Sequence, residues 1–360
     1  MKICIVATSL GQGGSERAAA MQSIMLTELG YEVHLVLMSN IILFEFNGEV
    51  FNLGKMKNKS NSIFNKIRRA LLFRKFLKDN SFDAVIDNRG RNNGLWHEVG
   101  ISKYVYRNLK ILYVVHSASF KQTMIKNICV NKWLLKNAYK IITVSEGMLP
   151  FLKLFYNENK LSCIQNSVDI EFITRKSLQE FKLPYRYILY CGRFEEFSKN
   201  IKLLIRAYTL SKLYKKGIQL ILLGEGENKN DYEKLAKNLK IANQIVFQAF
   251  TSNPYVYMKN AMFTVLTSRF EGFPLVLIES LACGTPVLAI DCETGPSEII
   301  QNNVNGLLLE SFDENELSNA LLKMASNEEL LEKFRSNAIS SIQKFNKQNI
   351  SNRWKAILES

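Results

Sequence analysis

The chain has 360 residues, of which 47% are hydrophobic and 22% charged; this is a globular balance, and the length favours two domains over one. No apolar run reaches the about eighteen residues that a membrane-spanning helix needs, and the N-terminus lacks the apolar region and cleavage site of a signal peptide, so we expect a cytoplasmic protein. Six cysteines without a C-x-x-C pair predict reduced, buried thiols, and three histidines without zinc-ligand spacing predict no protein-bound metal.

The net charge of +14 is unevenly distributed along the chain. Residues 1–165 hold 23 Lys/Arg and 11 Asp/Glu, which gives +12, whereas residues 166–360 hold 24 and 22, which gives +2. A basic half joined to a nearly neutral one predicts that the N-terminal half faces an anionic surface.

The first half reads as alternating strands and helices. A buried strand at residues 2–8 leads through a glycine-rich turn into a helix over about 15–29. The further elements expected in this half are strands at 31–38, 84–87, 111–115 and 140–144 and helices around 62–79 and 128–138.

The pattern restarts after a strand and linker at residues 163–169. Residues 170–185 are interpreted as irregular, and the last segment, about 328–359, as helical. Between them the strands are expected at 186–191, 218–223, 244–247, 263–266, 286–290 and 306–308, with a helix over 200–213. Strand–helix–strand repeats predict two doubly wound parallel sheets, whose ligands bind outside the carboxyl ends of the strands.

Glycines and polar residues cluster where those strands end. Gly11-Gln12-Gly13-Gly14-Ser15-Glu16-Arg17 follows the first strand, and such a turn at a helix N-terminus suits a phosphate group. The spacing is not G-x-G-x-x-G, and no acidic residue ends the second strand, so classical dinucleotide binding is disfavoured. A merely tight strand–helix turn is the alternative.

A second cluster runs from Cys191 through Gly192 and Arg193 to Lys199 and Asn200. Arg193 and Lys199 are placed to grip one anion, the first as a fork and the second as a point charge, and a diphosphate carries enough charge to need both. The alternative is two solvated surface cations.

The most specific string is Glu271-Gly272-Phe273-Pro274-Leu275-Val276-Leu277-Ile278-Glu279. It places Glu271 in a loop and Glu279 in an apolar helix that ends before Gly284-Thr285-Pro286. The two carboxylates could accept hydrogen bonds from the hydroxyls of two sugars, while the helix N-terminus between them faces phosphate.

His116 directly follows the strand at 111–115, where a side chain faces the ligand edge of the sheet. It could orient a substrate hydroxyl or handle a proton, or it could be a structural histidine.

Residues 62–78 combine six cations and no acid with strongly apolar residues, and residues 120–140 repeat the mixture. This composition suits an anionic membrane surface, although a core-packing helix with a solvated face is an equal alternative. No nucleic-acid motif accompanies the charge, so we expect no nucleic-acid partner.

Taken in order, these strings resemble the family 4 retaining glycosyltransferases of the GT-B fold, over nearly the whole chain. The resemblance implies an α/β architecture of two Rossmann-like domains with an inter-domain cleft. Residues 1–168 would form the acceptor-binding domain, residues 169–342 the nucleotide-sugar-binding domain, and residues from about 343 to 360 a C-terminal crossover helix.

The resemblance also assigns roles. Gly13 and Gly14 would lie beside the donor diphosphate, His116 near the donor sugar and reaction centre, and Arg193, after Gly192, with Lys199 on the diphosphate. Glu271 would contact donor-sugar hydroxyls, backbone N–H groups near Phe273, Pro274 and Leu275 would face the phosphates, and Glu279 would bind the ribose. The base would contact Ala249-Phe250, where Ala249 replaces the glycine usual in the family.

These roles imply a metal-free transfer, without a cofactor, of a hexose or N-acetylhexosamine from a nucleotide sugar, favoured as UDP-linked. The expected acceptor is a glycan or polyprenyl-linked glycan of bacterial envelope polysaccharide or lipopolysaccharide synthesis, reached by a cytoplasmic protein peripheral at the membrane. A nucleotide-sugar epimerase of the same fold and a non-catalytic sugar-nucleotide-binding scaffold are the alternatives.

Overall fold

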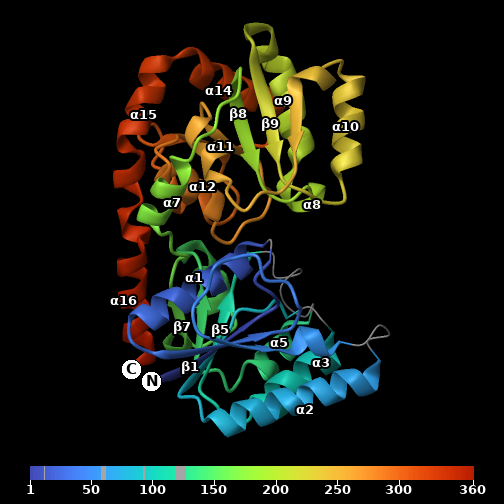
Figure 1. Cartoon of the computed structure of the whole chain (residues 1–360), viewed down its shortest axis with the longest axis vertical. Coiled ribbons are helices and arrows are strands. Elements are labelled where there is room, and N and C mark those ends of the chain that lie inside the picture. The colour runs from blue at the N-terminus through green and yellow to red at the C-terminus, as the bar shows by residue number, and fades with distance from the viewer. Residues whose placement is uncertain (12, 58–61, 92–93, 119–126) are drawn as a thin grey trace. The chain divides into compact units, whose positions relative to one another are not determined.

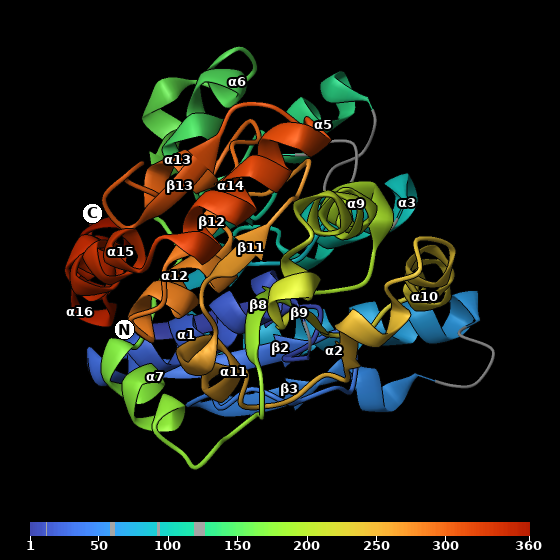
Figure 2. The same cartoon turned by 90° about the horizontal axis from the view of Figure 1, so that it is seen from above.

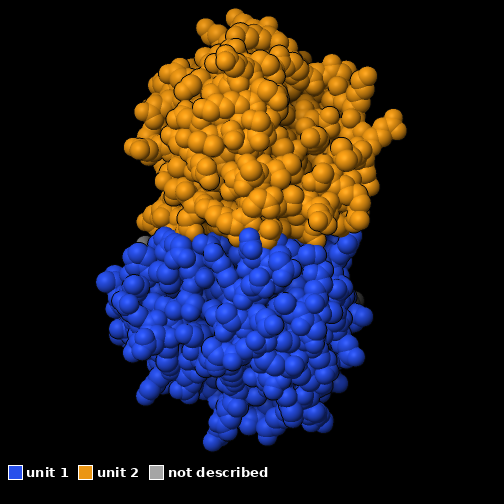
Figure 3. All heavy atoms as spheres, turned by 90° about the vertical axis from the view of Figure 1, so that its left-hand side faces the viewer, with its two compact units in different colours: residues 1–167, 347–360 blue, residues 168–346 orange. Residues whose placement is uncertain are grey.

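The computed structural model describes residues 1–11, 13–57, 62–91, 94–118 and 127–360, and it divides into two compact units. Unit 1 comprises residues 1–167 and 347–360, and unit 2 comprises residues 168–346; Figure 3 colours them separately. The division falls beside the boundary expected at 168/169, and the chain returns to unit 1 at Lys347 rather than near 343.

The described residues of unit 1 form a seven-stranded sheet in the order β3-β2-β1-β4-β5-β6-β7, and every pairing is parallel (Figure 1). The strands are β1 (Lys2–Ala7), β2 (Glu32–Leu37), β3 (Glu49–Asn52), β4 (Ala84–Asp87), β5 (Ile111–Val115), β6 (Lys140–Thr143) and β7 (Leu161–Cys163). The helices are α1 (Gly14–Glu28), α2 (Ile63–Asn80), α3 (Leu95–Val99), α5 (Ile128–Leu134), α6 (Leu149–Lys153) and α16 (Lys347–Leu358), with a π-helical segment η2 (Gly100–Val105).

Unit 2 has a six-stranded sheet in the order β10-β9-β8-β11-β12-β13, again parallel throughout its described pairs. The strands are β8 (Arg186–Cys191), β9 (Ile218–Leu223), β10 (Ile245–Gln248), β11 (Thr264–Leu266), β12 (Val287–Ile290) and β13 (Gly306–Leu309). The helices are α7 (Ile170–Ser177), α8 (Glu196–Lys199), α9 (Ile201–Ser211), α10 (Lys229–Asn238), α11 (Tyr255–Asn260), α12 (Leu275–Ala282), α13 (Pro296–Ile299), α14 (Glu314–Ser326) and α15 (Glu328–Ser341).

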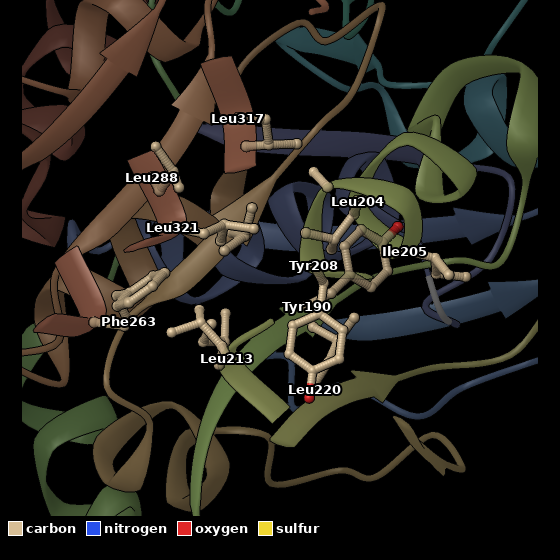
Figure 4. Packing of buried hydrophobic residues seen from close by; sticks show 14 of the residues in the cluster. Tyr190, Leu204, Ile205, Tyr208, Leu213, Leu220, Phe263, Leu288, Leu317 and Leu321 are labelled. Atoms are coloured by element: carbon tan, nitrogen blue, oxygen red, sulfur yellow. The ribbon is translucent and has the colours of Figure 1, made fainter. Parts of the chain in front are cut away.

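The core of unit 2 lies where α9 and α14 pack together on one face of the sheet, while α11 and α12 pack on the other (Figure 2). Tyr190 of β8, Tyr208 of α9 and Leu321 of α14 are all fully buried in this cluster (Figure 4). Burial of such large side chains contributes roughly 1.5–3 kcal/mol each relative to exposure. The packing fixes β8 and its neighbours, and therefore the loops at their carboxyl ends.

The secondary structure differs from the expectations at particular places. Residues 170–177 are helical rather than irregular, because Asp169 accepts a hydrogen bond from the Phe172 backbone N–H (2.9 Å) and starts α7, whose Ile173 is buried, whereas residues 178–185 are irregular as expected. The strand β3 was not foreseen, since its four residues sit at a half-exposed edge of the sheet without an apolar alternation.

The C-terminal segment is helical, as expected, and consists of α15 and α16. It breaks between α15 and α16, where Phe345 is buried and its carbonyl accepts from the Val168 backbone N–H (3.1 Å). The helix expected at 128–138 ends at Leu134, and the part of the second basic stretch at residues 119–126 lies outside the described residues.

Candidate functional site

The turning point of the unit 2 sheet brings two of the predicted residues together. β8 and β11 are neighbours, and the strand order runs in opposite directions from them, which makes this the place where open parallel sheets generally bind their ligands. Lys199 follows β8 and Glu271 follows β11, and Lys199 Nζ donates to Glu271 Oε1 at 2.6 Å. Their side chains are 18% and 12% exposed, so the pair is reachable but largely desolvated.

The position of Lys199 is fixed by hydrogen bonds to its backbone. Asn200, in the left-handed conformation (φ 52°), separates α8 from α9 and turns the chain there. Thr267 Oγ1 donates to the carbonyls of Lys199 (3.1 Å) and Asn200 (3.2 Å). The Arg269 backbone N–H donates to Ser198 O (2.7 Å), and its guanidinium to Glu196 O (2.8 Å). The loop after β11 therefore holds both members of the pair.

A second set of contacts fixes the segment from Glu271 to α12. Thr294 Oγ1 donates to Glu271 O at 2.7 Å. Gly295 has φ 101°, and a Cβ there would lie 2.7 Å from Pro274 Cδ, so only glycine fits this approach. Pro274 immediately precedes α12, which begins at Leu275, and Phe273 packs edge-on against Phe345 at 5.0 Å between ring centroids. Phe273, Pro274 and Leu275 therefore lie at the α12 N-terminus, as expected, and the first N–H groups of a helix have no partner within it.

Gly192 and Arg193 directly follow β8, at the same end of the sheet. A Cβ on Gly224 (φ 149°) would overlap the Gly192 carbonyl oxygen at 1.9 Å, so the chain segments after β8 and β9 touch only because Gly224 has no side chain. Arg193 is exposed. Burial, followed by the negative charge of Glu271, raises the pKa of Tyr190 well above its usual range, whereas the charge of Arg193 acts in the opposite direction. The Tyr190 hydroxyl thus lies within electrostatic range of both.

The remaining predicted residues of unit 2 are not part of this pair. Glu279 is 5% exposed within α12. Ala249 is exposed and Phe250 half-buried after β10, two strands from β8 in the sheet order.

In unit 1, the glycine turn enters α1 as expected. Gly13 caps the helix, and a Cβ on it would overlap the Glu16 carboxylate at 1.9 Å. Gly14 is the first helical residue, and within 4 Å a Cβ on it would meet no other part of the chain that the structure describes. The packing of the described residues therefore does not require glycine at position 14. Gln12 lies outside the described residues.

His116 lies at the carboxyl end of β5 with a polar partner that the sequence analysis did not single out. His116 Nε2 hydrogen-bonds Asn88 Oδ1 at 2.9 Å, and Asn88 Nδ2 donates to Gln22 Oε1 at 2.8 Å. Burial, and then the nearby positive charge of Arg91, lowers the pKa of His116 from 6.5 to about 3, despite an opposing effect of Asp87. His116 is therefore neutral at physiological pH.

The sequence analysis also missed the buried charges after β4. Arg89 binds Asp87 through Nε (3.0 Å) and Nη2 (2.8 Å) and approaches Glu98 at 3.5 Å. Arg91 donates to the carbonyls of Val114 (3.2 Å) and Arg89 (3.4 Å). The rule that selected His116, a polar residue just after a predicted strand, also selects Asn88 and Arg89 after residues 84–87.

Among the described residues, no group of three or more His, Cys, Asp or Glu is arranged to hold a metal ion. A search of the described helices for one long and apolar enough to cross a membrane finds none.

Comparisons with known proteins point in one direction. Residues 173–341 match the family of glycosyl transferases group 1. Over 364 aligned residues, 97% of each chain, the protein is 31% identical to the N-acetylgalactosamine-N,N'-diacetylbacillosaminyl-diphospho-undecaprenol 4-alpha-N-acetylgalactosaminyltransferase of Campylobacter jejuni.

Two solved structures share the fold. One is S. aureus TarM in complex with fondaparinux, alpha-GlcNAc-glycerol and UDP, with a TM-score of 0.81, 16% identity and 100% of both chains covered. The other is Anabaena HepE in complex with UDP and glucose, with a TM-score of 0.80, 19% identity and the same coverage. The fold of the chain is GT-B, as expected from the sequence.

Proposed function

Since the chain belongs to the glycosyl transferases of group 1, we propose that it moves a hexose or N-acetylhexosamine from a UDP-sugar to a glycan or lipid-linked glycan of the bacterial envelope. The enzyme class follows from the family. The observation that carries the rest is the Lys199–Glu271 pair at the turning point of the unit 2 sheet, 2.6 Å apart and partly buried. It places a cation for a departing phosphate beside a carboxylate for sugar hydroxyls.

The residues present fit a donor of this kind. Negative charge develops on the diphosphate as the glycosidic bond breaks, and fixed positive groups stabilise it most where water is scarce. In this proposal Lys199, Arg193 and the α12 N-terminus supply that charge without a divalent metal or another cofactor. Glu271 accepts hydrogen bonds from donor-sugar hydroxyls, Glu279 from the ribose, and Ala249-Phe250 contact the base. Attack on the same face as departure then retains the anomeric configuration.

The proposed acceptor is based on the name of a relative and on the charge of the N-terminal half. The name of the C. jejuni relative describes a diphospho-undecaprenol acceptor and an alpha linkage. We carry this acceptor class to the present chain, because its N-terminal half bears +12. A diphosphate-linked lipid in an anionic membrane is attracted to such a surface.

The α2 surface supports association with the membrane. Phe64 is 85% exposed and Ile67 53%, and both lie on the same helix face as Leu71. Lys66, Arg68 and Lys78 are exposed on the same helix, whose buried residues include Phe73 and Leu77. Exposed aromatic and aliphatic residues among cations are typical of helices that lie in a membrane interface.

The function is tested by UDP release. The purified protein is incubated with UDP-glucose, UDP-galactose, UDP-GlcNAc or UDP-GalNAc, with and without a polyprenyl-diphosphate-linked sugar. We expect UDP release that depends on the acceptor. We also expect an α-linked product from an α-linked donor. No release with any UDP-sugar contradicts the donor, an inverted product contradicts retention, and sugar interconversion without acceptor identifies an epimerase.

The membrane association is tested by vesicle sedimentation. Replacing Lys66, Arg68 and Lys78 together by Gln should weaken binding to phosphatidylglycerol vesicles on the order of 100-fold, since each such charge contributes about 1 kcal/mol near an anionic surface. The matched control replaces three exposed lysines of unit 2, Lys215, Lys216 and Lys237, which should bind as the parent does. An equal loss of vesicle binding in both variants would mean that the binding depends on the net charge of the protein and not on the α2 surface.

A further inference from the structure

Three polar side chains of unit 1 form a hydrogen-bonded chain that ends at His116. Gln22 comes from α1, Asn88 follows β4, and His116 follows β5. The two bonds measure 2.8 Å from Asn88 Nδ2 to Gln22 Oε1 and 2.9 Å from His116 Nε2 to Asn88 Oδ1. Gln22 and Asn88 are only 3% and 4% exposed. Buried amides of this kind are hydrogen-bonded because an unsatisfied one costs roughly 1–3 kcal/mol.

The middle residue of the chain is held by the sheet. The Asn88 backbone N–H donates to Val6 O at 2.8 Å, which continues the β1–β4 ladder one residue past β4. Gln22 lies on the buried face of α1, next to Ser23, which is fully buried. The backbone of Asn88 is therefore fixed by β1, and its side-chain amide is fixed by α1. Its carboxamide is held in one orientation.

That orientation determines which nitrogen of His116 carries the proton. Asn88 uses its NH₂ group on Gln22, so the atom it presents to His116 is the oxygen, an acceptor. Nε2 must then donate, and in a neutral imidazole the other nitrogen, Nδ1, is left as an acceptor.

The residue that carries this free acceptor lines a cavity. Nδ1 of His116 is buried and has no hydrogen-bond partner among the described residues, and the same is true of Ser167 Oγ. Both residues line one cavity of about 20 Å³, together with Gln22 and Asn88. A space of that size and polarity has room for about one water or hydroxyl group. Two residues with unpaired polar atoms thus line one cavity that has room for a single hydroxyl group or water.

We propose that Asn88 and Gln22 are positioning residues, which hold His116 as the Nε2-protonated tautomer so that Nδ1 accepts a hydrogen bond from a substrate hydroxyl. The proposal rests on the proposed function for the identity of that substrate. No proton leaves or enters the ring. The Nε2 proton stays on the imidazole and is hydrogen-bonded to Asn88 Oδ1, and Nδ1 only accepts the hydrogen bond of the substrate hydroxyl. A neutral acceptor of fixed direction orients a hydroxyl without becoming its base.

The test reads the tautomer directly by NMR. The chain has three histidines, so ¹⁵N-labelled protein gives three ring systems, and the single variants His34→Gln and His97→Gln assign them. We expect the His116 ring to show a protonated Nε2 and an unprotonated Nδ1. A protonated Nδ1 overturns the proposal, whatever the activity is.

Two variants test the positioning residues. Gln22→Leu removes the acceptor that orients the Asn88 amide, so the His116 ring should become a mixture of tautomers, and UDP release should fall on the order of tenfold, as for other partners that orient an imidazole. Asn88→Asp keeps an acceptor toward Nε2, so it should retain the tautomer and more of the turnover. An unchanged tautomer in Gln22→Leu would refute the role of Gln22.

The same experiments separate the proposal from the function. If His116→Ala releases UDP normally while the parent shows the expected tautomer, the geometry stands and the catalytic use of His116 fails. Thermal unfolding of each variant checks the fold.

Discussion

Each unit gathers polar side chains at the carboxyl ends of its strands, but the two edges are built differently. In unit 2 the pair Lys199–Glu271 is charged, partly exposed, and held from outside by hydrogen bonds to backbone carbonyls from Thr267, Arg269 and Thr294. In unit 1 the chain ending at His116 is neutral and held by two buried amides.

The difference follows from what each edge does in the proposed reaction. A departing diphosphate is stabilised by positive charge. A charged side chain without a bound ligand has a lower desolvation cost when it keeps some contact with water, so partial exposure suits Lys199 and Glu271. A hydroxyl needs only a directed acceptor, which the neutral, half-buried imidazole of His116 provides through its buried Nδ1. Substitutions at the charged edge should therefore mainly lower the turnover rate. Changes at the neutral edge should mainly affect the orientation of the substrate hydroxyl and the pH dependence of stability.

The largest effect is expected at the charged pair. Lys199→Ala should lower kcat by about 100- to 1000-fold, the range seen when one stabilising donor is removed from a transition state, and Glu271→Ala should likewise lose most transfer. Because both side chains are largely desolvated, each variant leaves its partner as an unpaired charge, so the thermal midpoint should also fall and turnover is compared at a temperature where every variant is folded. UDP release measures the effect, with exposed Lys215→Ala as the control. Near-normal turnover in either variant refutes the role of that residue.

The next largest effect is expected on stability at Gly295, which packs against Pro274 beside the charged edge. Gly295→Ala should destabilise unit 2 by about 1–3 kcal/mol, because the residue has φ 101° and its Cβ would press on Pro274. Gly284→Ala is the matched control: its φ is also positive (76°), but its Cβ would meet only Lys259 Nζ at 3.7 Å. Thermal unfolding compares the two. Equal destabilisation would mean that the contact with Pro274 contributes nothing.

A smaller effect is expected from pH on the neutral edge. The pKa of His116 is lowered from 6.5 to about 3 in the folded protein, so the unfolded chain binds the extra proton first and stability is lost as pH falls below about 6.5. From pH 7 to pH 5 this group should cost about 2 kcal/mol by linkage. Denaturant unfolding of the parent and of His116→Gln at both values measures the difference. An equal loss in both proteins would assign the acid sensitivity to other groups.

The smallest effect on stability is expected at Gly14. Gly14→Ala should change it by less than about 0.5 kcal/mol, because its Cβ would contact none of the described residues outside its own helix turn and alanine favours a helix. If a diphosphate approaches the backbone there, UDP release should nevertheless fall. Gly13→Ala, whose Cβ meets the Glu16 carboxylate, is the comparison for a change that also disturbs the protein. Full activity in Gly14→Ala would remove that residue from the site.

Local pattern was enough to predict most strands. The bounds expected for β4, β5, β8 and β9 agree with the structure residue for residue, because buried parallel strands are short apolar runs bounded by polar residues. It failed at α7, where helix formation depends on the Asp169 cap, and at β3, whose short sequence pairs only because β2 lies beside it.

The sequence by itself determined the two α/β halves, the family resemblance, and the residue types at the strand ends, since periodicity and motif spacing are properties of neighbours in the chain. Only the tertiary structure decided that Lys199 meets Glu271, 72 residues away, and that Gln22 and Asn88 stand behind His116. Such pairs arise from strand order and packing, which bring distant segments to one edge of a sheet, and no local pattern encodes that distance.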